Sequence, residues 1–138
     1  MMPQAMQFPF RALNPAAGSA GLFPILPIQL ALGPQTVSAL GLVDSGALVN
    51  VLPYDLGLQL GVDWDKQTTQ VQLTGNLAPC EARGVVVNGT VGSFPPVPLV
   101  FAWTKSNAVP LLLGQTNFLM EFDVCLFRSK GIFEVKPK

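Results

Sequence analysis

Short apolar runs separated by glycine and proline make up most of this chain, and no segment keeps a helical period for long. The 13 glycines and 13 prolines interrupt the sequence every few residues, which is typical of many short strands. We therefore expect an all-β fold, a small closed or nearly closed β-barrel with one or two short helices. Residues 1–21, rich in Pro, Ala and Gly, predict an extended N-terminal arm ahead of a single domain at 22–138.

Turn residues bound each expected element. In the first half of the chain we expect strands at 25–32, 36–43 and 49–52, with a turn at 33–35. Pro53 then begins a helix of one or two turns, which continues to Leu60 and ends before Gly61. Polar and apolar residues alternate over 68–73, which predicts a half-exposed strand. A turn at 74–76 and a partner strand through 80–82 complete a predicted protruding hairpin.

The second half predicts more short strands and one short helix. We expect strands at 85–87, 97–103, 111–113, 122–127 and 132–135, a helix at 115–120 and a hairpin turn at 88–90. The terminal strands 122–127 and 132–135 are apolar and need cover, so they are the candidates for a subunit seam.

Composition excludes several classes of protein. The formal net charge is 0 and basic runs are absent, so the chain lacks the electrostatic footprint of a nucleic-acid binder. The 138 residues include no histidine, which excludes Ser-His-Asp and Cys-His catalysis and the common zinc sites. We expect no metal and no cofactor. The two cysteines, Cys80 and Cys125, are expected to be buried thiols in a reducing compartment.

Nothing in the sequence predicts membrane insertion or export. The apolar stretch at 22–32 is too short to span a bilayer and contains Pro24 and Pro27. The first residues lack the basic region of a signal peptide. We therefore expect a cytoplasmic protein. Because hydrophobic residues make up 49% of the chain and charged residues 12%, we also expect part of its surface to be buried against a subunit or ligand.

The most informative segment is Asp44-Ser45-Gly46-Ala47, which directly follows an apolar strand. Such a loop projects one carboxylate from a tight turn, since Ser45 bonds nearby backbone and Gly46 has wide conformational freedom. Taken alone, this pattern favours an Asx-turn that only caps a strand. A second element changes the interpretation: Leu112-Leu113-Gly114 is followed at once by a predicted helix.

With these two elements in this order, the chain resembles the retropepsin-like aspartic proteases, the single-lobe enzymes whose active site is completed by dimerisation. The resemblance extends from about residue 25 to the C-terminus and implies a homodimeric acid-protease barrel acting on peptide or protein substrates. The chemistry agrees, because carboxylate hydrolysis needs two carboxylates that share one proton, and a symmetric dimer supplies the second copy of Asp44. The other acidic segment, Asp63-Trp64-Asp65, lacks a glycine turn and is interpreted as a surface loop.

The resemblance implies a role for each residue of the loop. Asp44 is the catalytic residue; Ser45, where retroviral enzymes more often carry Thr, braces the two loops across the two-fold axis. Gly46 lets substrate backbone approach, and Ala47 fits the tight space behind it. The hairpin around Thr74 and Gly75 corresponds to a flap over bound peptide. The remaining implied substrate-binding residues are Leu42, Leu48, Val51, Pro110 and Leu112.

One departure from the pattern leaves the function open. Leu48 stands where these enzymes usually carry an Asp that binds substrate backbone, and Gln115 stands where retroviral members carry an Arg that pairs with it. Losing both charges together avoids an unpaired buried ion. The leading hypothesis is an active aspartic endopeptidase. The alternatives are a weakly active or inactive dimer of the same fold that binds peptide or directs assembly, and an unrelated barrel in which Asp44 only caps a turn.

Overall fold

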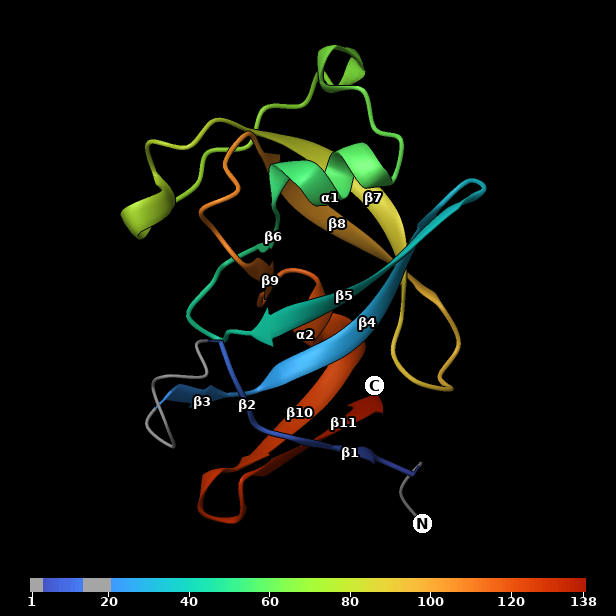
Figure 1. Cartoon of the computed structure of the whole chain (residues 1–138), viewed down its shortest axis with the longest axis vertical. Helices are drawn as coiled ribbons and strands as arrows, with labels where there is room; N and C mark the ends of the chain where they lie inside the picture. Colours follow the sequence, from blue (N-terminus) through green and yellow to red (C-terminus); the bar gives the residue numbers. More distant parts are fainter. Residues whose placement is uncertain (1–3, 14–20) are drawn as a thin grey trace.

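The computed structural model describes residues 4–13 and 21–138. Six strands close into a barrel, and the N-terminal and C-terminal strands form a small sheet beneath it in the view of Figure 1. The strands are β1 (Met6–Pro9), β2 (Arg11–Ala12), β3 (Leu22–Phe23), β4 (Ile25–Leu32), β5 (Gln35–Val43), β6 (Asn50–Leu52), β7 (Ala82–Thr90), β8 (Val97–Thr104), β9 (Leu111–Leu113), β10 (Phe122–Phe127) and β11 (Ile132–Pro137). The helices are α1 (Tyr54–Gln59) and α2 (Phe118–Glu121), with short 3-10 turns at Trp64–Lys66, Gly75–Leu77 and Arg128–Lys130.

The barrel has the strand order β4-β5-β9-β6-β8-β7 and closes between β7 and β4. Strands β5 and β9 run parallel, as do β6 and β8, and the other neighbours are antiparallel. Every residue of β6 and β9 is buried, because successive side chains point to opposite faces of the sheet and an apolar cluster covers each face. The expected all-β barrel with two short helices is confirmed.

Two apolar clusters fill the molecule. The larger is built around Phe101, Trp103 and Phe118, each 0% exposed, and extends from the barrel to Phe133 of β11. The smaller contains Val51 and Leu112 and lies beneath the loop that carries Asp44. The Asp44 loop therefore rests on a packed layer of apolar side chains.

A second sheet joins the two ends of the described chain. Strand β11 is central and pairs antiparallel with β1 on one side and β10 on the other. Phe8 stacks on Phe133 with ring centroids 5.6 Å apart, so this part of the predicted N-terminal arm packs against the C-terminal strands. Residues 14–20 of the predicted arm lie outside the described residues.

The prediction of a two-stranded hairpin at 68–82 is wrong, because the segment does not form a pair of strands. Only its base is paired: the Val71 amide donates to the Ala82 carbonyl (3.0 Å) and the Gly84 amide to the Thr69 carbonyl (2.8 Å). Beyond that point the chain uses its backbone groups locally, in the 3-10 turn Gly75–Leu77. Proline at position 79 has no amide to donate to a ladder, which explains why no partner strand forms.

Three other expectations are corrected. The segment 88–90 is not a turn but the end of β7, where Asn88 pairs with Pro98 of β8. The helix predicted at 115–120 is shorter, α2, because the amides of Gln115 and Thr116 bond to the Asp44 loop. The two cysteines are free thiols but are not buried: Cys125 is exposed and Cys80 half-buried.

The acidic segment at 63–65 is exposed as expected at both carboxylates, although Trp64 between them is buried. The Arg83 guanidinium donates to the Trp64 carbonyl (2.7 Å) and lies 4.6 Å from the centre of its ring. These contacts give the segment a structural role. Among the described residues, no helix has the length and apolar character needed to cross a membrane.

Candidate active site

Asp44 lies directly after β5, at the end of the parallel pair that β5 makes with β9. Its amide donates to the Leu113 carbonyl of β9 (3.0 Å), which fixes the start of the loop. The Gly46 amide then donates to Asp44 Oδ1 (2.8 Å), and the Ala47 amide to the Asp44 carbonyl (3.1 Å). The turn therefore holds the carboxylate by its own backbone, as an Asx-turn does.

The segment that directly follows β9, residues 114–116, is hydrogen-bonded to the same loop, and we call this set of bonds the clamp. Backbone amides of Gln115 and Thr116 donate to the carbonyls of Ala47 and Leu48, both at 2.9 Å. Gln115 also donates from its side-chain amide to the Ser45 carbonyl. The loop is thus bonded along its length to one short segment.

Gly114 makes this close approach possible. A Cβ atom at this position would lie 2.6 Å from the Val49 carbonyl oxygen and 2.7 Å from that of Ala47. Both contacts are to backbone, which cannot move aside without breaking the clamp. The second element of the sequence pattern therefore has a steric reason.

A pair of asparagines supports the clamp and was missed in the sequence. Asn50, 0% exposed, accepts the Gly114 amide on Oδ1 (2.8 Å) and donates from Nδ2 to the Val100 carbonyl (2.9 Å) and to Asn117 Oδ1 (3.0 Å). Asn117 in turn accepts the Val100 amide (3.1 Å) and donates to the Pro98 carbonyl (3.1 Å). A lone polar residue in the apolar run 49–52 was the signal for such a network, since buried amides need partners.

The Asp44 loop borders a hollow of about 390 Å³. Its walls come from the loop, from β6 and β9, and from the segment around the 3-10 turn Gly75–Leu77. The lining residues are Asp44, Gly46, Ala47, Leu48, Val49, Val51, Gln72, Leu73, Thr74, Gly75, Asn76, Leu77 and Leu112. Among these described residues Asp44 alone is ionisable, so the hollow presents one carboxylate on an apolar and neutral polar wall.

Most residues predicted for the site meet at this hollow. Asp44, Gly46, Ala47, Leu48, Val51, Thr74, Gly75 and Leu112 line it. Ser45 is exposed at the loop tip, Leu42 packs half-buried against the smaller core cluster, and Pro110 is exposed just before β9. Val49 and Gln72 line the hollow and were not predicted.

The segment at 72–78 covers the side of the hollow opposite the loop. Gln72 ties it together, donating from its side-chain amide to the carbonyls of Leu73 (3.0 Å) and Ala78 (3.2 Å). Leu73 is buried, while Thr74, Gly75 and Asn76 are exposed. The segment is therefore held by Leu73 and the half-buried Leu77, which pack in the smaller apolar cluster, while its tip is exposed.

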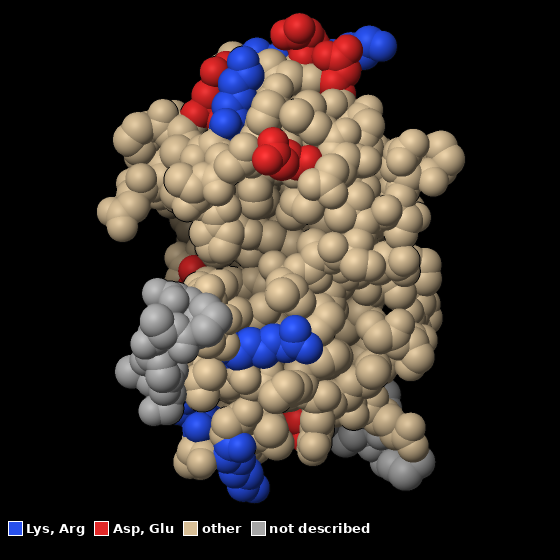
Figure 2. All heavy atoms as spheres, in the orientation of Figure 1, with Lys and Arg blue, Asp and Glu red and all other residues tan. Residues whose placement is uncertain are grey.

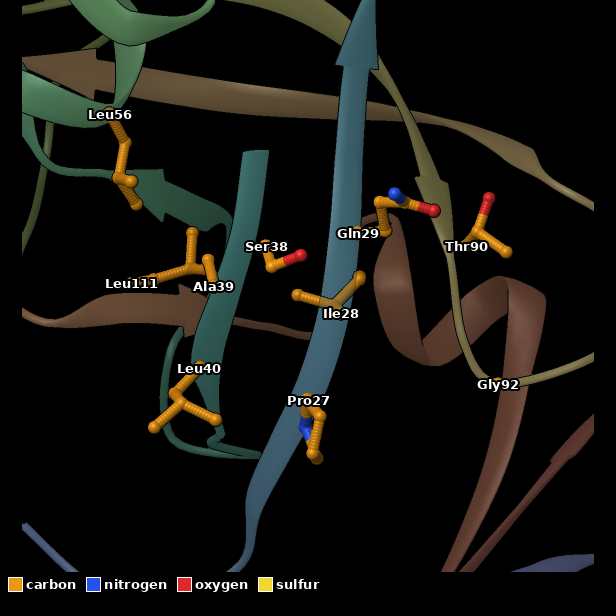
Figure 3. A pocket seen from close by; sticks show the side chains of 10 residues that line it. All are labelled: Pro27, Ile28, Gln29, Ser38, Ala39, Leu40, Leu56, Thr90, Gly92 and Leu111. Carbon is orange, nitrogen blue, oxygen red and sulfur yellow. The ribbon is translucent and has the colours of Figure 1, made fainter. Parts of the chain in front are cut away.

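A larger hollow, of about 700 Å³, lies elsewhere, along the β4–β5 pair. Figure 3 shows the residues around it, which include Leu56 of α1, Leu111 of β9 and Thr90 at the end of β7. None of its ten lining residues is ionisable, so it offers no acid–base group. In Figure 2, charged side chains gather toward the two ends of the visible face, and the band between them is almost uncharged. Of these two hollows, only the one beside the Asp44 loop has an acid–base group in its wall.

Of the comparisons with known proteins, the one with solved structures bears on the fold. No protein-family model and no curated protein matches the chain. Among solved structures it is similar to a retropepsin-like aspartic protease from Rickettsia conorii, with a TM-score of 0.63 and 18% sequence identity. The match covers 96% of this chain and 91% of that one. The chain therefore has the fold of a retropepsin-like aspartic protease, as its two sequence elements predicted.

Proposed function

We propose that this protein is an aspartic endopeptidase whose active form is a homodimer with one Asp44 from each subunit. The observation that carries the proposal is the Asp44 loop: a carboxylate held by the Gly46 amide at 2.8 Å, at the mouth of a hollow with no other ionisable group. The fold supports the same function, since a retropepsin-like neighbour covers 96% of the chain.

The mechanism follows from two carboxylates at one site. Two carboxylates a few ångströms apart do not both ionise readily, so one keeps a proton while the other stays charged. The charged Asp44 takes a proton from a water molecule as that water attacks the peptide carbonyl. The protonated Asp44 of the second subunit donates to the carbonyl oxygen, and a later proton transfer to the amide nitrogen releases the new amine.

The lining of the hollow favours uncharged peptide. Leu48, Val51 and Leu112 present apolar surface, and Gln72 and Asn76 present neutral amides. Apart from Asp44 itself, the wall offers a charged substrate side chain no ionic partner to offset its lost hydration. The segment at 72–78 would cover the bound peptide and exclude water.

The test is the substitution Asp44→Asn, which keeps the size of the side chain and an oxygen able to accept the Gly46 amide. We expect it to abolish cleavage of an apolar peptide at acidic to mildly acidic pH, with the dimer preserved in sedimentation. Asp65→Asn, at an exposed carboxylate far along the chain, is the matched control and should leave cleavage unchanged. Full activity in Asp44→Asn would refute the proposal.

A second candidate function is suggested by Leu48 and Gln115. Neutral residues at both positions remove an ionic anchor for substrate backbone, and Leu48 is 56% exposed. A dimer of this kind would bind apolar peptide without cutting it. Tight peptide binding by the unmodified protein, without cleavage of a diverse peptide library at any pH from 3 to 8, would favour this function over the first.

A further inference from the structure

The larger hollow, along the β4–β5 pair, is a second concave site that the proposed function does not use. Its volume of about 700 Å³ falls in the range of roughly 300–1,000 Å³ that small-molecule pockets occupy. It shares no lining residue with the hollow beside Asp44. A ligand bound here would therefore not touch the residues proposed for cleavage.

A row of three neutral polar side chains crosses the sheet at this hollow. Gln29 of β4 pairs with Ser38 of β5 on one side and with Thr90 of β7 on the other, so the three side chains share one face. Figure 3 shows Gln29 between Ser38 and Thr90. Within the part of the chain that the structure describes, none of these three side chains is hydrogen-bonded to another residue. Their amide and hydroxyl groups are therefore available to a ligand.

An apolar pair lies two residues further along the same face. Pro27 pairs with Leu40, and this pair lies about 7 Å from the pair of Gln29 and Ser38, since a strand rises about 3.3 Å per residue. Figure 3 shows Pro27 and Leu40 below the polar row. Leu40 is 53% exposed, which leaves apolar surface in contact with water. The hollow therefore has a polar part and an apolar part within the length of one small molecule.

Other apolar side chains extend the apolar part of the hollow. Ile28 and Leu111 are each 3% exposed, and Leu56 of α1 is half-buried. Because none of the ten lining residues is ionisable, the wall offers a charged ligand no ionic partner to offset its lost hydration. An uncharged ligand with an apolar body and one hydrogen-bonding head matches both parts of the wall.

We propose that this hollow is a binding site for an uncharged, largely apolar molecule that carries an amide group. The side-chain amide of Gln29 has both a donor and an acceptor, so it can form two hydrogen bonds with an amide of the ligand. The hydroxyls of Ser38 and Thr90 flank this amide and bond the remaining polar atoms of the head. The apolar body then covers Leu40 and Pro27, which agrees with the apolar composition of the chain.

The compound 2-naphthamide is the probe for this site, and 2-naphthoate is its matched control. The two molecules have the same ring system, but the first carries a neutral amide and the second a carboxylate. In isothermal titration calorimetry with the full chain at neutral pH, we expect saturable binding of 2-naphthamide. We expect 2-naphthoate to bind at least about tenfold more weakly, because the wall holds no cation to offset the lost hydration of its carboxylate.

Three substitutions locate the bound probe. Leu40→Glu places a charge in the apolar part and should weaken binding of 2-naphthamide at least about tenfold. Gln29→Leu removes the amide that pairs with the head and should weaken binding about fivefold, since hydrogen bonds are lost. Leu48→Glu, at a similarly exposed leucine of the Asp44 hollow (56% exposed), is the matched control and should leave binding unchanged. Circular dichroism checks that each variant remains folded.

Several results would overturn the site: no saturable binding of 2-naphthamide up to about 1 mM, equal binding of 2-naphthoate, unchanged binding in Gln29→Leu, or binding lost in Leu48→Glu but not in Leu40→Glu. Sedimentation of Leu40→Glu tests a different occupant. If the wild type binds no amide and Leu40→Glu changes its oligomeric state, the hollow is a protein contact and the ligand site is wrong. Cleavage is measured separately, so amide binding by a chain that cuts no peptide supports the site and counts against the peptidase.

Discussion

The side-chain amide of Gln115 donates a hydrogen bond to the main-chain carbonyl of Ser45. This bond adds to the two backbone bonds that the same segment makes to Ala47 and Leu48. The residue after Gly114 therefore braces the tip of the loop that carries Asp44.

Gln115→Ala should loosen this loop more than it destabilises the protein. Loss of one hydrogen bond should lower the free energy of unfolding by about 1 kcal/mol. Gln67→Ala is the matched control, because it removes a similar bond to the Asp63 carbonyl (3.2 Å) away from the hollow. We expect similar losses in urea unfolding, but reduced peptide cleavage only in Gln115→Ala. Equal cleavage by both variants would contradict a bracing role.

Gly114→Ala should destabilise the whole domain. The added Cβ would meet the carbonyl oxygens of Val49 and Ala47 at 2.6 and 2.7 Å, so the clamp or the loop must shift. We expect a loss of about 3 kcal/mol, measured by denaturant unfolding. Gly84→Ala is the control, since its new Cβ would meet nothing closer than the Thr69 side chain at 3.6 Å. An unchanged free energy of unfolding in Gly114→Ala would show that the loop can move away from residue 114 without destabilising the domain.

Asn50→Ala should lower the free energy of unfolding by about as much as Gly114→Ala, for a different reason. The change leaves the Gly114 amide and the Val100 carbonyl without these partners and removes one of the two hydrogen bonds that Asn117 Oδ1 accepts. With more than one buried polar group unsatisfied, we expect a loss of about 3 kcal/mol in urea unfolding. Asn88→Ala, at an exposed asparagine of β7, should change stability by less than about 0.5 kcal/mol. A similarly small effect at Asn50 would mean that water replaces its bonds.

The sequence predicted the barrel well where burial and turn residues agreed. Strands β4, β9 and β10 have the expected bounds, and Pro53 and Gly61 flank α1 as expected. In these segments the local pattern and the tertiary environment favour the same structure. The Asp44 loop and Gly114 were recognised for the same reason, because the close packing of the site requires small residues at fixed positions.

The wrong predictions of secondary structure fall in segments where tertiary contacts overrode the preference of the local sequence. Asn88-Gly89 is a strong turn signal, yet Gly89 lies within β7, where a Cβ would meet Leu99 Cδ1 at 2.4 Å. That glycine serves close packing, which a single sequence does not distinguish from turning. The alternation over 68–73 correctly placed Leu73 in the interior, but alternation does not guarantee a partner strand. Contacts between distant segments, such as Asn50 with Asn117, leave no periodic trace at all.

A last test of the site introduces a pair of opposite charges at positions 48 and 115, where this chain has Leu48 and Gln115. In Leu48→Asp the new carboxylate stands at an exposed position of the hollow, where it can accept an amide from peptide backbone. Adding Gln115→Arg supplies its ionic partner. Because the pair is exposed, we expect a coupling of roughly 0.2–1 kcal/mol in a double-mutant cycle of urea unfolding. In a peptidase that lacks only this anchor, the double variant should lower KM several-fold, and Gln115→Arg alone, which replaces the brace on the Ser45 carbonyl but adds no carboxylate, should not. A double variant with unchanged KM would mean that Leu48 does not face bound peptide.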